Sequence, residues 1–331
     1  MNNRLIVALT WPASPEEASH IRGALDPGFE VVVPETRETE ALSEAVEGCD
    51  VILSWSSPPM SVLDNAKRVR FIQTLLAGVD SFEFSDLKER GILLAGVSGA
   101  NATGVAEHAL ALMLALAKNL VKAHIDLTAG TFPPYTTDAM NIDLYGKRLT
   151  IVGLGNVGIE VARTAFALGM EVTGVRKHPK STTLEDREIE VAGTHDLRRV
   201  LSGADFVVLT VPLTEETRGL IAGEELRAMK KTAFLVNVSR GEVVDEEALY
   251  RALVEGWIAG AGLDVWYQYP PSPHTPSKIG LHRLRNVVAT PHRAAWTKSA
   301  YRKSLDAAVQ NLNRYIRGQE LRNLVDLDLG Y

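Results

Sequence analysis

The chain has 331 residues, which is long for one hydrophobic core, so two domains are expected. Its composition of 46% apolar and 23% charged residues is ordinary for a globular protein, and a net charge of -6 gives no reason to expect nucleic acid as a partner. Cys49 is the only cysteine. It excludes an internal disulfide and a thiolate metal cluster, and it is typical of the reducing cytoplasm, where we expect the protein to reside.

The N-terminal stretch "MNNRLIVALT" predicts a short strand and lacks the apolar core of a signal peptide. Further strands are predicted in "FEVVV", "DVILSW" and "RFIQTLL", with helices over residues 15–25 and 40–47 between them. Strands that alternate with helices favour a parallel sheet covered by helices on both faces.

A strongly apolar helix is predicted over residues 103–120. Its stretch "HALALMLALAKNL" is shorter than the ~20 residues that a membrane span needs, and we interpret it as a buried helix of a protein without a membrane segment. Glu107 and His108 lie within this helix and are interpreted as packing residues or helix–helix contacts.

A second set of strands follows, in "RLTIVGLG", "MEVTGV", "DFVVLTV", "AFLVNVS", "IAGAGLDV" and "NVVATPH". These runs are almost continuously apolar, as in parallel sheets with both faces covered. A long amphipathic helix over 298–317 and a C-terminal tail are predicted to return to the first domain. The α/β fold would therefore comprise two doubly wound parallel-sheet domains, a discontinuous one of residues 1–101 and 297–331 and a continuous one of 102–296.

The segment "IVGLGNVGIEVARTAFALGMEVTGVRKHPK" contains glycines spaced as in a dinucleotide-binding turn. Gly153 permits a tight turn after the strand, Gly155 lets the backbone approach a pyrophosphate, and Gly158 lets the helix pack closely on the strand. Asn156 and Val157 begin the helix, whose free N–H groups and dipole favour a negative charge. Between a clear strand and a clear helix, this spacing predicts a Rossmann nucleotide-binding domain.

The next strand ends without the acidic residue that would accept hydrogen bonds from the ribose of NAD. Arg176 occupies that position, with Lys177 beside it and Lys180 close by. A cationic cluster suits a 2′-phosphate, which arginine can bind with two parallel hydrogen bonds. We therefore predict that NADP(H) is preferred over NAD(H), the alternative being a solvated basic turn.

Four further segments, "GANATGVAEHALALMLALAKNL", "DFVVLTVPLTEETRGLI", "FLVNVSRGEVVDEEAL" and "VVATPH", resemble the D-isomer-specific 2-hydroxyacid dehydrogenase family. The likeness runs in the same order from about Ile72 to His292, whereas the first seventy residues match only in pattern. The resemblance implies a flavodoxin-like substrate-binding domain built from both chain ends, a nucleotide domain between them in sequence, and an active site in the cleft.

The resemblance also implies roles for individual residues. Arg240 would bind the substrate carboxylate and polarise the keto oxygen, and His292 would be the general acid for reduction and the base for oxidation. The remaining implied contacts are carboxylate binding by the backbone N–H groups of Ala77 and Gly78, a hinge and substrate position for Asn101, nicotinamide binding by Val238 and Asp264, and cofactor contacts of Pro212 and Thr217. No spacing typical of metal ligands is present.

One position departs from the family pattern. The family usually places a glutamate five residues after the aspartate of the "LDV" strand, where it keeps the histidine protonated, and here Tyr269 stands at that position. A neutral phenol cannot raise a histidine pKa by charge. The enzyme could reduce 2-oxoacids with a less basic His292, resemble formate dehydrogenase, which needs no proton transfer, or bind nucleotide with weak activity. A shift of register in the loop could also bring Gln268 to the site.

The loop after "DVILSW" faces the substrate's side chain in this family, and Ser54 and Trp55 would lie there. An indole favours an apolar or compact group over a phosphate, although Trp55 could equally be a core residue. The leading function is an NADPH-dependent reductase of a glyoxylate- or hydroxypyruvate-type 2-oxoacid. The alternatives are a formate-like small-oxyanion dehydrogenase and a nucleotide-sensing scaffold without activity. The apolar helix predicts a homodimer, since it carries more apolar surface than its own domain needs to cover.

Overall fold

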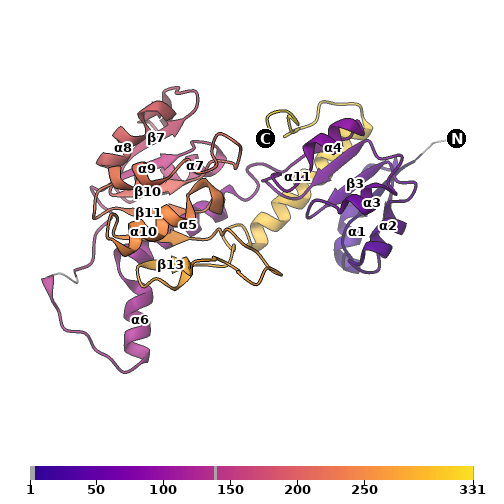
Figure 1. Cartoon of the computed structure of the whole chain (residues 1–331). Helices are drawn as coiled ribbons and strands as arrows, with labels where there is room; N and C mark the ends of the chain where they lie inside the picture. The colour runs from indigo at the N-terminus through magenta and orange to yellow at the C-terminus, as the bar shows by residue number, and fades with distance from the viewer. Residues whose placement is uncertain (1–3, 138–139, 331) are drawn as a thin grey trace. The chain divides into compact units, whose positions relative to one another are not determined.

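A computed structural model describes residues 4–137 and 140–330. The chain forms two compact units, unit 1 of Met1–Asn101 with Lys298–Tyr331 and unit 2 of Ala102–Thr297 (Figure 1). Thr297 therefore groups with unit 2, one residue beyond the range expected for the nucleotide domain.

Unit 1 is built on a five-stranded parallel sheet with the order β2-β1-β3-β4-β5. This is the flavodoxin-like order, as expected from the sequence. The strands are β1 (Leu5–Leu9), β2 (Phe29–Val32), β3 (Val51–Ser54), β4 (Phe71–Thr74) and β5 (Leu93–Ala95). The sequence does not predict strand β5, because it is only three residues long and lies in the short run "GILLAG".

Helices cover both faces of this sheet. One core cluster contains apolar residues of α1 (Pro15–Ala24) and α11 (Lys298–Ile316). The other contains residues of α2 (Thr39–Val46), α3 (Met60–Leu63) and α4 (Phe84–Glu89). After α11 the chain pairs with the edge strand, since Val325 N–H donates to the Leu94 carbonyl over 2.8 Å. The C-terminal segment thus completes unit 1.

Unit 2 contains an eight-stranded sheet with the order β13-β12-β11-β10-β6-β7-β9-β8. Its strands are β6 (Arg148–Val152), β7 (Glu171–Arg176), β8 (Thr182–Leu184), β9 (Arg187–Gly193), β10 (Phe206–Leu209), β11 (Phe234–Asn237), β12 (Gly260–Leu263) and β13 (Val287–Ala289). Strand β6 lies between β7 and β10 and is parallel to both. The strands that follow β6 in sequence are therefore added first on one side of it and then on the other, as in dinucleotide-binding folds.

One strand pair differs from the parallel arrangement that the sequence predicts. Strands β8 and β9 are antiparallel and form a hairpin with a two-residue turn at Glu185 and Asp186, both at positive φ. The sequence predicts neither strand, because "TTLEDREIEVAG" is too polar to suggest a buried strand and has no asparagine or glycine at the two turn positions, where such a residue is usual.

Helices also cover both faces of the larger sheet. Residues of α5 (Ala102–Ala117) and α7 (Asn156–Ala167) pack into one core cluster. Residues of α8 (Leu197–Gly203), α9 (Gly223–Ala228) and α10 (Glu246–Val254) pack into the other. Two layers of helices therefore enclose the apolar strands, which explains why their sequences do not alternate.

The helix predicted over 103–120 forms as α5, and a second helix that the sequence does not predict follows it. Helix α5 ends at Ala117, Asn119 adopts a left-handed conformation with φ 50°, and α6 (Leu120–Thr128) follows at an angle of 60°. Within the described residues no single helix is long and apolar enough to cross a membrane. Among these residues, only α5 and α6 taken together reach that length and apolar character, and they are bent relative to each other. Helix α6 stands away from the rest of unit 2 (Figure 1) and buries none of its residues.

Candidate active site

Three neighbouring parallel strands of unit 2 bring the predicted catalytic residues to one edge of the sheet. Asn237 at the end of β11 pairs with Leu263 of β12, which pairs with Ala289 of β13. Arg240, Asp264 and His292 follow these three strands, so they all lie at the carboxyl edge. This is the edge at which α/β sheets bind their ligands.

The loop that carries His292 has a strained backbone held by buried hydrogen bonds. His292 adopts φ 57°, a left-handed conformation uncommon outside glycine. Asp264 is fully buried, and its carboxylate accepts hydrogen bonds from the backbone N–H groups of Arg293 and Ala294, both over 2.8 Å. The hydroxyl of Thr290 donates to the same carboxylate over 2.6 Å. Asp264 therefore binds the loop on both sides of the histidine.

The pKa of Asp264 reflects these contacts. Burial alone would raise the pKa of the carboxyl group, because it removes water from the charged form. Hydrogen bonds from His108, Thr290 and the two backbone N–H groups outweigh burial, and the pKa lies below its ordinary value. Asp264 is thus an anion at neutral pH. Its predicted contact with a nicotinamide carboxamide stays a prediction, while the structure shows it holding the His292 loop.

A second buried side chain shapes the turn of Arg240. The carboxamide of Asn237, only 1% exposed, donates to the Arg240 carbonyl over 2.8 Å and accepts from the Ser239 N–H and hydroxyl over 3.0 and 2.8 Å. The Arg240 guanidinium donates to the Ser239 carbonyl over 2.8 Å. Val238, which is predicted to contact nicotinamide, lies in this turn and is 9% exposed.

Tyr269 lies against His292. The centroids of the two rings are 5.5 Å apart, with planes tilted by 45°. The phenol oxygen accepts a hydrogen bond from the Trp266 N–H over 3.1 Å. Gln268, the alternative candidate, has its carboxamide oxygen bonded to the Ser272 hydroxyl over 3.0 Å. The structure therefore brings Tyr269, rather than Gln268, to the histidine.

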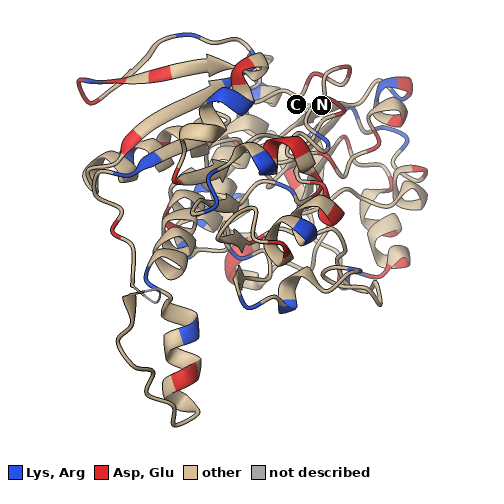
Figure 2. Ribbon diagram, turned by 60° about the vertical axis from the view of Figure 1, so that its left-hand side comes forward, with Lys and Arg blue, Asp and Glu red and all other residues tan. Residues whose placement is uncertain are grey.

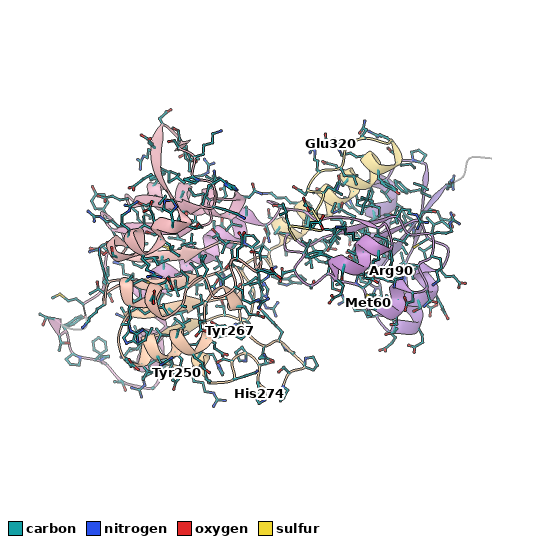
Figure 3. All side chains as sticks on the ribbon, turned by 45° about the horizontal axis from the view of Figure 1, so that its top comes forward. Met60, Arg90, Tyr250, Tyr267, His274 and Glu320 are labelled. Atoms are coloured by element: carbon teal, nitrogen blue, oxygen red, sulfur yellow. The ribbon has the colours of Figure 1, made fainter. Side chains whose placement is uncertain are left out.

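The Pro-rich loop after β12 continues the site toward the surface. Tyr267 is largely enclosed and donates its hydroxyl to the Val244 carbonyl over 2.9 Å, whereas His274 is exposed on the outer part of the loop (Figure 3). Burial, with the nearby Glu246 and Asp245, raises the pKa of the Tyr267 phenol. Tyr267 is therefore a neutral structural residue, and His274 provides a surface histidine for comparison with His292.

The glycine turn after β6 has the geometry of a phosphate-binding turn. Gly153 has φ 103°, and a Cβ there would come within 2.8 Å of the Val211 side chain. A Cβ at Gly158 would overlap the Gly153 carbonyl, which explains the close packing of α7 on the strand. A Cβ at Gly155 would meet no protein atom within 4 Å. Gly155 precedes Asn156 and Val157 at the start of α7, where a pyrophosphate would be stabilised by the helix N-terminus.

The basic residues after β7 make contacts within unit 2. The Arg176 guanidinium donates to the Leu154 carbonyl in the glycine turn through Nε, over 3.0 Å, and through Nη2. Lys177 pairs with Glu216 over 2.7 Å, and both side chains are exposed. Arg176 thus lies beside the turn that would hold the pyrophosphate, with part of its guanidinium remaining for a further acceptor.

The loop after β10 contains Pro212 and Thr217. The Thr217 hydroxyl donates to the Pro212 carbonyl over 2.7 Å and accepts from the Thr214 N–H over 2.8 Å. These bonds hold the loop at the same carboxyl edge, next to β6. Contact of either residue with a cofactor stays a prediction.

In unit 1 the predicted carboxylate-binding residues follow β4. Among the described residues, the backbone N–H groups of Ala77 and Gly78 donate no hydrogen bond to another backbone group. Two consecutive N–H groups of this kind suit an anion. Asn101, the last residue of unit 1 before the chain enters unit 2, is partly buried.

Ser54, the last residue of β3, and Trp55, which follows it, differ in their surroundings. Ser54 is fully buried, and within the described residues its hydroxyl has no hydrogen-bond partner, like that of Thr10 on the neighbouring strand end. Trp55 stacks on Tyr301 with 5.4 Å between centroids and meets Trp11 edge-on at 6.2 Å. Trp55 therefore belongs to an aromatic cluster of unit 1, and its contact with substrate stays a prediction.

Comparison with known proteins agrees with this geometry. Residues 110–294 match the family model of the D-isomer specific 2-hydroxyacid dehydrogenase NAD binding domain. A glyoxylate reductase of Korarchaeum cryptofilum is 37% identical over 295 residues, covering 88% of this chain and 86% of the relative. A D-3-phosphoglycerate dehydrogenase of Methanocaldococcus jannaschii is 33% identical over 300 residues, covering 90% and 56%. A Thermus thermophilus protein of known crystal structure has a TM-score of 0.79 and 32% identity, covering 97% and 100%.

The Rossmann unit with its glycine turn is typical of nicotinamide-dependent oxidoreductases. The matches then identify the family: the chain belongs to the D-isomer specific 2-hydroxyacid dehydrogenases and is an NAD(P)-dependent 2-hydroxyacid oxidoreductase.

Sequence reasoning missed three residues that build this site. Asn237 could have been noticed from the sequence, because it is a polar amide at the end of an apolar strand, within "VNVSRG". Thr290 and His108 gave no such signal, since their partners are distant in sequence. The sequence suggests that His108 is a packing residue, whereas it contacts the Thr290 hydroxyl over 2.9 Å and the Asp264 carboxylate over 3.4 Å.

Proposed function

We propose that the protein reduces a small 2-oxoacid of the glyoxylate or hydroxypyruvate type to its D-2-hydroxyacid with NADPH. The observation that carries the proposal is the conformation of His292, whose loop a buried carboxylate holds at φ 57°. His292 lies at the carboxyl edge of the sheet, where Arg240 also lies. A strained histidine fixed on both sides suits a residue whose position matters to chemistry.

The roles of the two side chains follow from the charge that develops during reduction. NADPH, when bound, supplies a hydride to the carbonyl carbon, so negative charge grows on the carbonyl oxygen. The Arg240 guanidinium stabilises that charge, and the His292 imidazolium donates the proton that completes the alcohol. In the reverse direction, neutral His292 accepts the proton.

We infer a preference for NADPH from the end of β7. Arg176 is bonded to the Leu154 carbonyl beside the glycine turn, and the strand end carries no carboxylate that would suit a free ribose hydroxyl. A partly available guanidinium and the neighbouring lysine favour a 2′-phosphate by charge-assisted hydrogen bonds. Lys177 would exchange its exposed pairing with Glu216 for this phosphate, at little cost, since exposed ion pairs contribute little.

A compact, uncharged substrate side chain is supported by unit 1. We assign Ala77 and Gly78 N–H groups to carboxylate binding and Asn101, Ser54 and Trp55 to substrate contacts. Ser54 and Trp55 supply a hydroxyl and an indole, and neither supplies the cation that a phosphate group would need.

One observation favours a second candidate. Tyr269 places a neutral ring against His292, where a carboxylate would keep the histidine protonated. Oxidation of formate releases carbon dioxide by hydride transfer and needs no proton donor. A formate-like small-oxyanion dehydrogenase is therefore the alternative activity.

A substrate panel tests the proposal. Glyoxylate, hydroxypyruvate, pyruvate and 3-phosphohydroxypyruvate are offered with NADPH or NADH, and formate is offered with NADP or NAD, while absorbance at the reduced nicotinamide band is followed. We expect the highest kcat/KM for glyoxylate or hydroxypyruvate with NADPH. Turnover of formate alone would replace the proposal by the alternative, and a preference for the phosphorylated substrate would overturn the assignment of a compact side chain.

We also propose a homodimer, with α6 and the loop after it as the contact surface. Helix α5, on which the sequence argument depends, buries eight residues in its own unit, including Leu112, Met113 and Leu116. In contrast, α6 and its loop expose large apolar residues and carry few charges (Figure 2): Leu120, Val121, Ile125, Leu127, Phe132, Tyr135 and Met140. A helix of nine residues is marginal without packing, and exposed apolar surface of this kind marks interfaces.

Light scattering tests the dimer. Ile125→Asp with Leu127→Asp should convert the protein to a monomer at micromolar concentration, because two charges would be buried in an apolar contact. Val254→Asp, which changes an equally exposed apolar residue of α10, should leave the dimer intact. A monomeric wild-type protein would overturn the proposal.

A further inference from the structure

His108 lies on the buried side of α5, one turn after Val105 and one turn before Leu112, both of which are buried. Its imidazole Nε2 is 2.9 Å from the Thr290 hydroxyl and 3.4 Å from Asp264 Oδ1. The side chain of His108 is 22% exposed and that of Asp264 is 1% exposed. A polar group therefore connects the long helix of unit 2 to the carboxylate that holds the His292 loop.

The distances determine which group donates. Thr290 has a single hydroxyl hydrogen, and Asp264 Oδ1, at 2.6 Å, can only accept it. The hydroxyl oxygen must then accept from His108, so His108 Nε2 carries a hydrogen. This hydrogen also faces Asp264 Oδ1, at a longer distance. The chain of bonds runs from His108 through Thr290 to Asp264 and from there to the N–H groups of Arg293 and Ala294.

We propose that His108 is a positioning residue for proton transfer, acting through Thr290 and Asp264 to hold His292 in its left-handed conformation. This inference rests on the proposed function, in which His292 donates the proton. Asp264 Oδ1 receives two strong donors, the Thr290 hydroxyl and the Arg293 N–H, and both flank His292 in sequence. A donor at position 108 orients the hydroxyl toward the carboxylate and prevents Thr290 from turning to its other acceptor, the Leu263 carbonyl at 3.5 Å.

The consequence concerns how often the loop is in its productive conformation. A non-glycine residue at positive φ costs free energy, and local hydrogen bonds must offset that cost. Loss of the His108 bond removes one of them. An ordinary hydrogen bond of this kind contributes a free energy that corresponds to a factor of about three to ten. Its loss should lower the fraction of molecules with the loop in its productive conformation, and hence kcat, by that factor.

Four variants separate the effect of the His108 hydrogen bond from the effect of its side-chain packing. His108→Gln keeps an N–H donor at the reach of Nε2, His108→Leu removes it, Thr290→Val removes the acceptor, and the double variant removes both. We expect His108→Leu to lower kcat for 2-oxoacid reduction about threefold to tenfold, with the KM for NADPH unchanged, and His108→Gln to recover most of the loss. In the Thr290→Val background, His108→Leu should add little, because its partner is already absent.

Hydrogen exchange supplies a measurement independent of activity. Exchange in a peptide covering residues 290–296 should be faster in His108→Leu than in wild type and His108→Gln, at an unchanged Tm. Equal kcat in His108→Leu and wild type would overturn the inference, as would an equal cost in the Thr290→Val background or a loss of kcat that only follows a fall in Tm. An inactive wild-type protein would instead contradict the proposed function, and the exchange measurement would still test the network.

Discussion

Two loops at the carboxyl edge of the larger sheet are held in different ways. The His292 loop is bonded through its backbone to a fully buried carboxylate, which also accepts from a threonine hydroxyl. The basic end of β7 is at the surface, where Lys177 makes an exposed ion pair and Arg176 bonds to one carbonyl of the glycine turn.

The contrast follows from what each loop has to do. A proton donor must be held within hydrogen-bond reach of one atom, and buried hydrogen bonds supply that rigidity. A phosphate can be recognised by mobile cations, whose strength is reduced by solvent and salt. Substitutions should therefore have larger effects at the His292 loop than at the end of β7.

Replacement of the histidine gives the largest expected effect. His292→Ala should lower kcat for 2-oxoacid reduction by about 10²- to 10⁴-fold, because the positioned proton donor is lost. His274→Ala, which changes an exposed histidine of the Pro-rich loop, should have no comparable effect. Steady-state rates with NADPH measure both. Full activity in His292→Ala would assign proton transfer to another group, and Tyr269 would be tested next.

Removal of the buried charge comes second. Asp264→Asn should lower kcat about 10- to 100-fold, since an amide cannot accept from all of the N–H and O–H donors that face it, and a buried unsatisfied donor costs about 1–3 kcal/mol. Asp205→Asn is the matched control, because Asp205 also accepts a backbone N–H and a side-chain donor but lies before β10 at the opposite end of the strands. The control should lower Tm without lowering kcat.

The same carboxylate predicts a pH dependence of stability. The pKa of Asp264 is lower in the folded protein than its ordinary value of 3.8, so the unfolded chain binds the proton more readily. Its contribution to stability is present above about pH 4 and is lost as the pH falls further through the folded-state pKa. Below about pH 4, the free energy of unfolding measured with urea should fall less steeply with decreasing pH in Asp264→Asn than in wild type. Parallel plots of this free energy against pH would contradict the assignment.

A smaller effect is expected at the end of β7. Arg176→Asp should shift the ratio of kcat/KM for NADPH over NADH by about 10- to 100-fold toward NADH, which corresponds to ~1–3 kcal/mol for charge-assisted hydrogen bonds. Arg199→Asp on α8 makes the same charge change at another exposed site and should leave the ratio unaltered. Equal kcat/KM for both cofactors in wild type would show that the basic turn is not a recognition element.

The smallest effect concerns Tyr269. Tyr269→Glu should move the descending limb of the reductive pH profile upward by roughly one pH unit, because a carboxylate near the imidazole favours its protonated form. Tyr269→Phe loses the same bond to the Trp266 N–H without adding charge, so its profile should stay in place. A limb that does not move in Tyr269→Glu would mean that the carboxylate does not reach His292.

Much of this protein could be predicted from local sequence. Continuous apolar runs predicted the parallel strands. The glycine spacing predicted a Rossmann turn, and in that turn Gly153 adopts a positive φ, which glycine permits. Arg240 and His292 were assigned from the family motifs "VSRG" and "TPH", each of which follows or ends an apolar run, and their catalytic roles stay predictions. The family assignment rested on the same local motifs and is confirmed by the matching relatives.

Tertiary structure alone decided the rest. Both α5 and α6 carry large apolar side chains, yet those of α5 are covered by its own unit and those of α6 are not, because coverage depends on which other elements pack against each helix. The hairpin β8–β9 forms from polar residues that no periodicity marks. The support of His292 comes from Asp264, and through Thr290 from His108, 182 positions before that threonine. A hydrogen bond needs its two groups within about 3 Å in space, and sequence spacing does not report that distance for residues on separate elements.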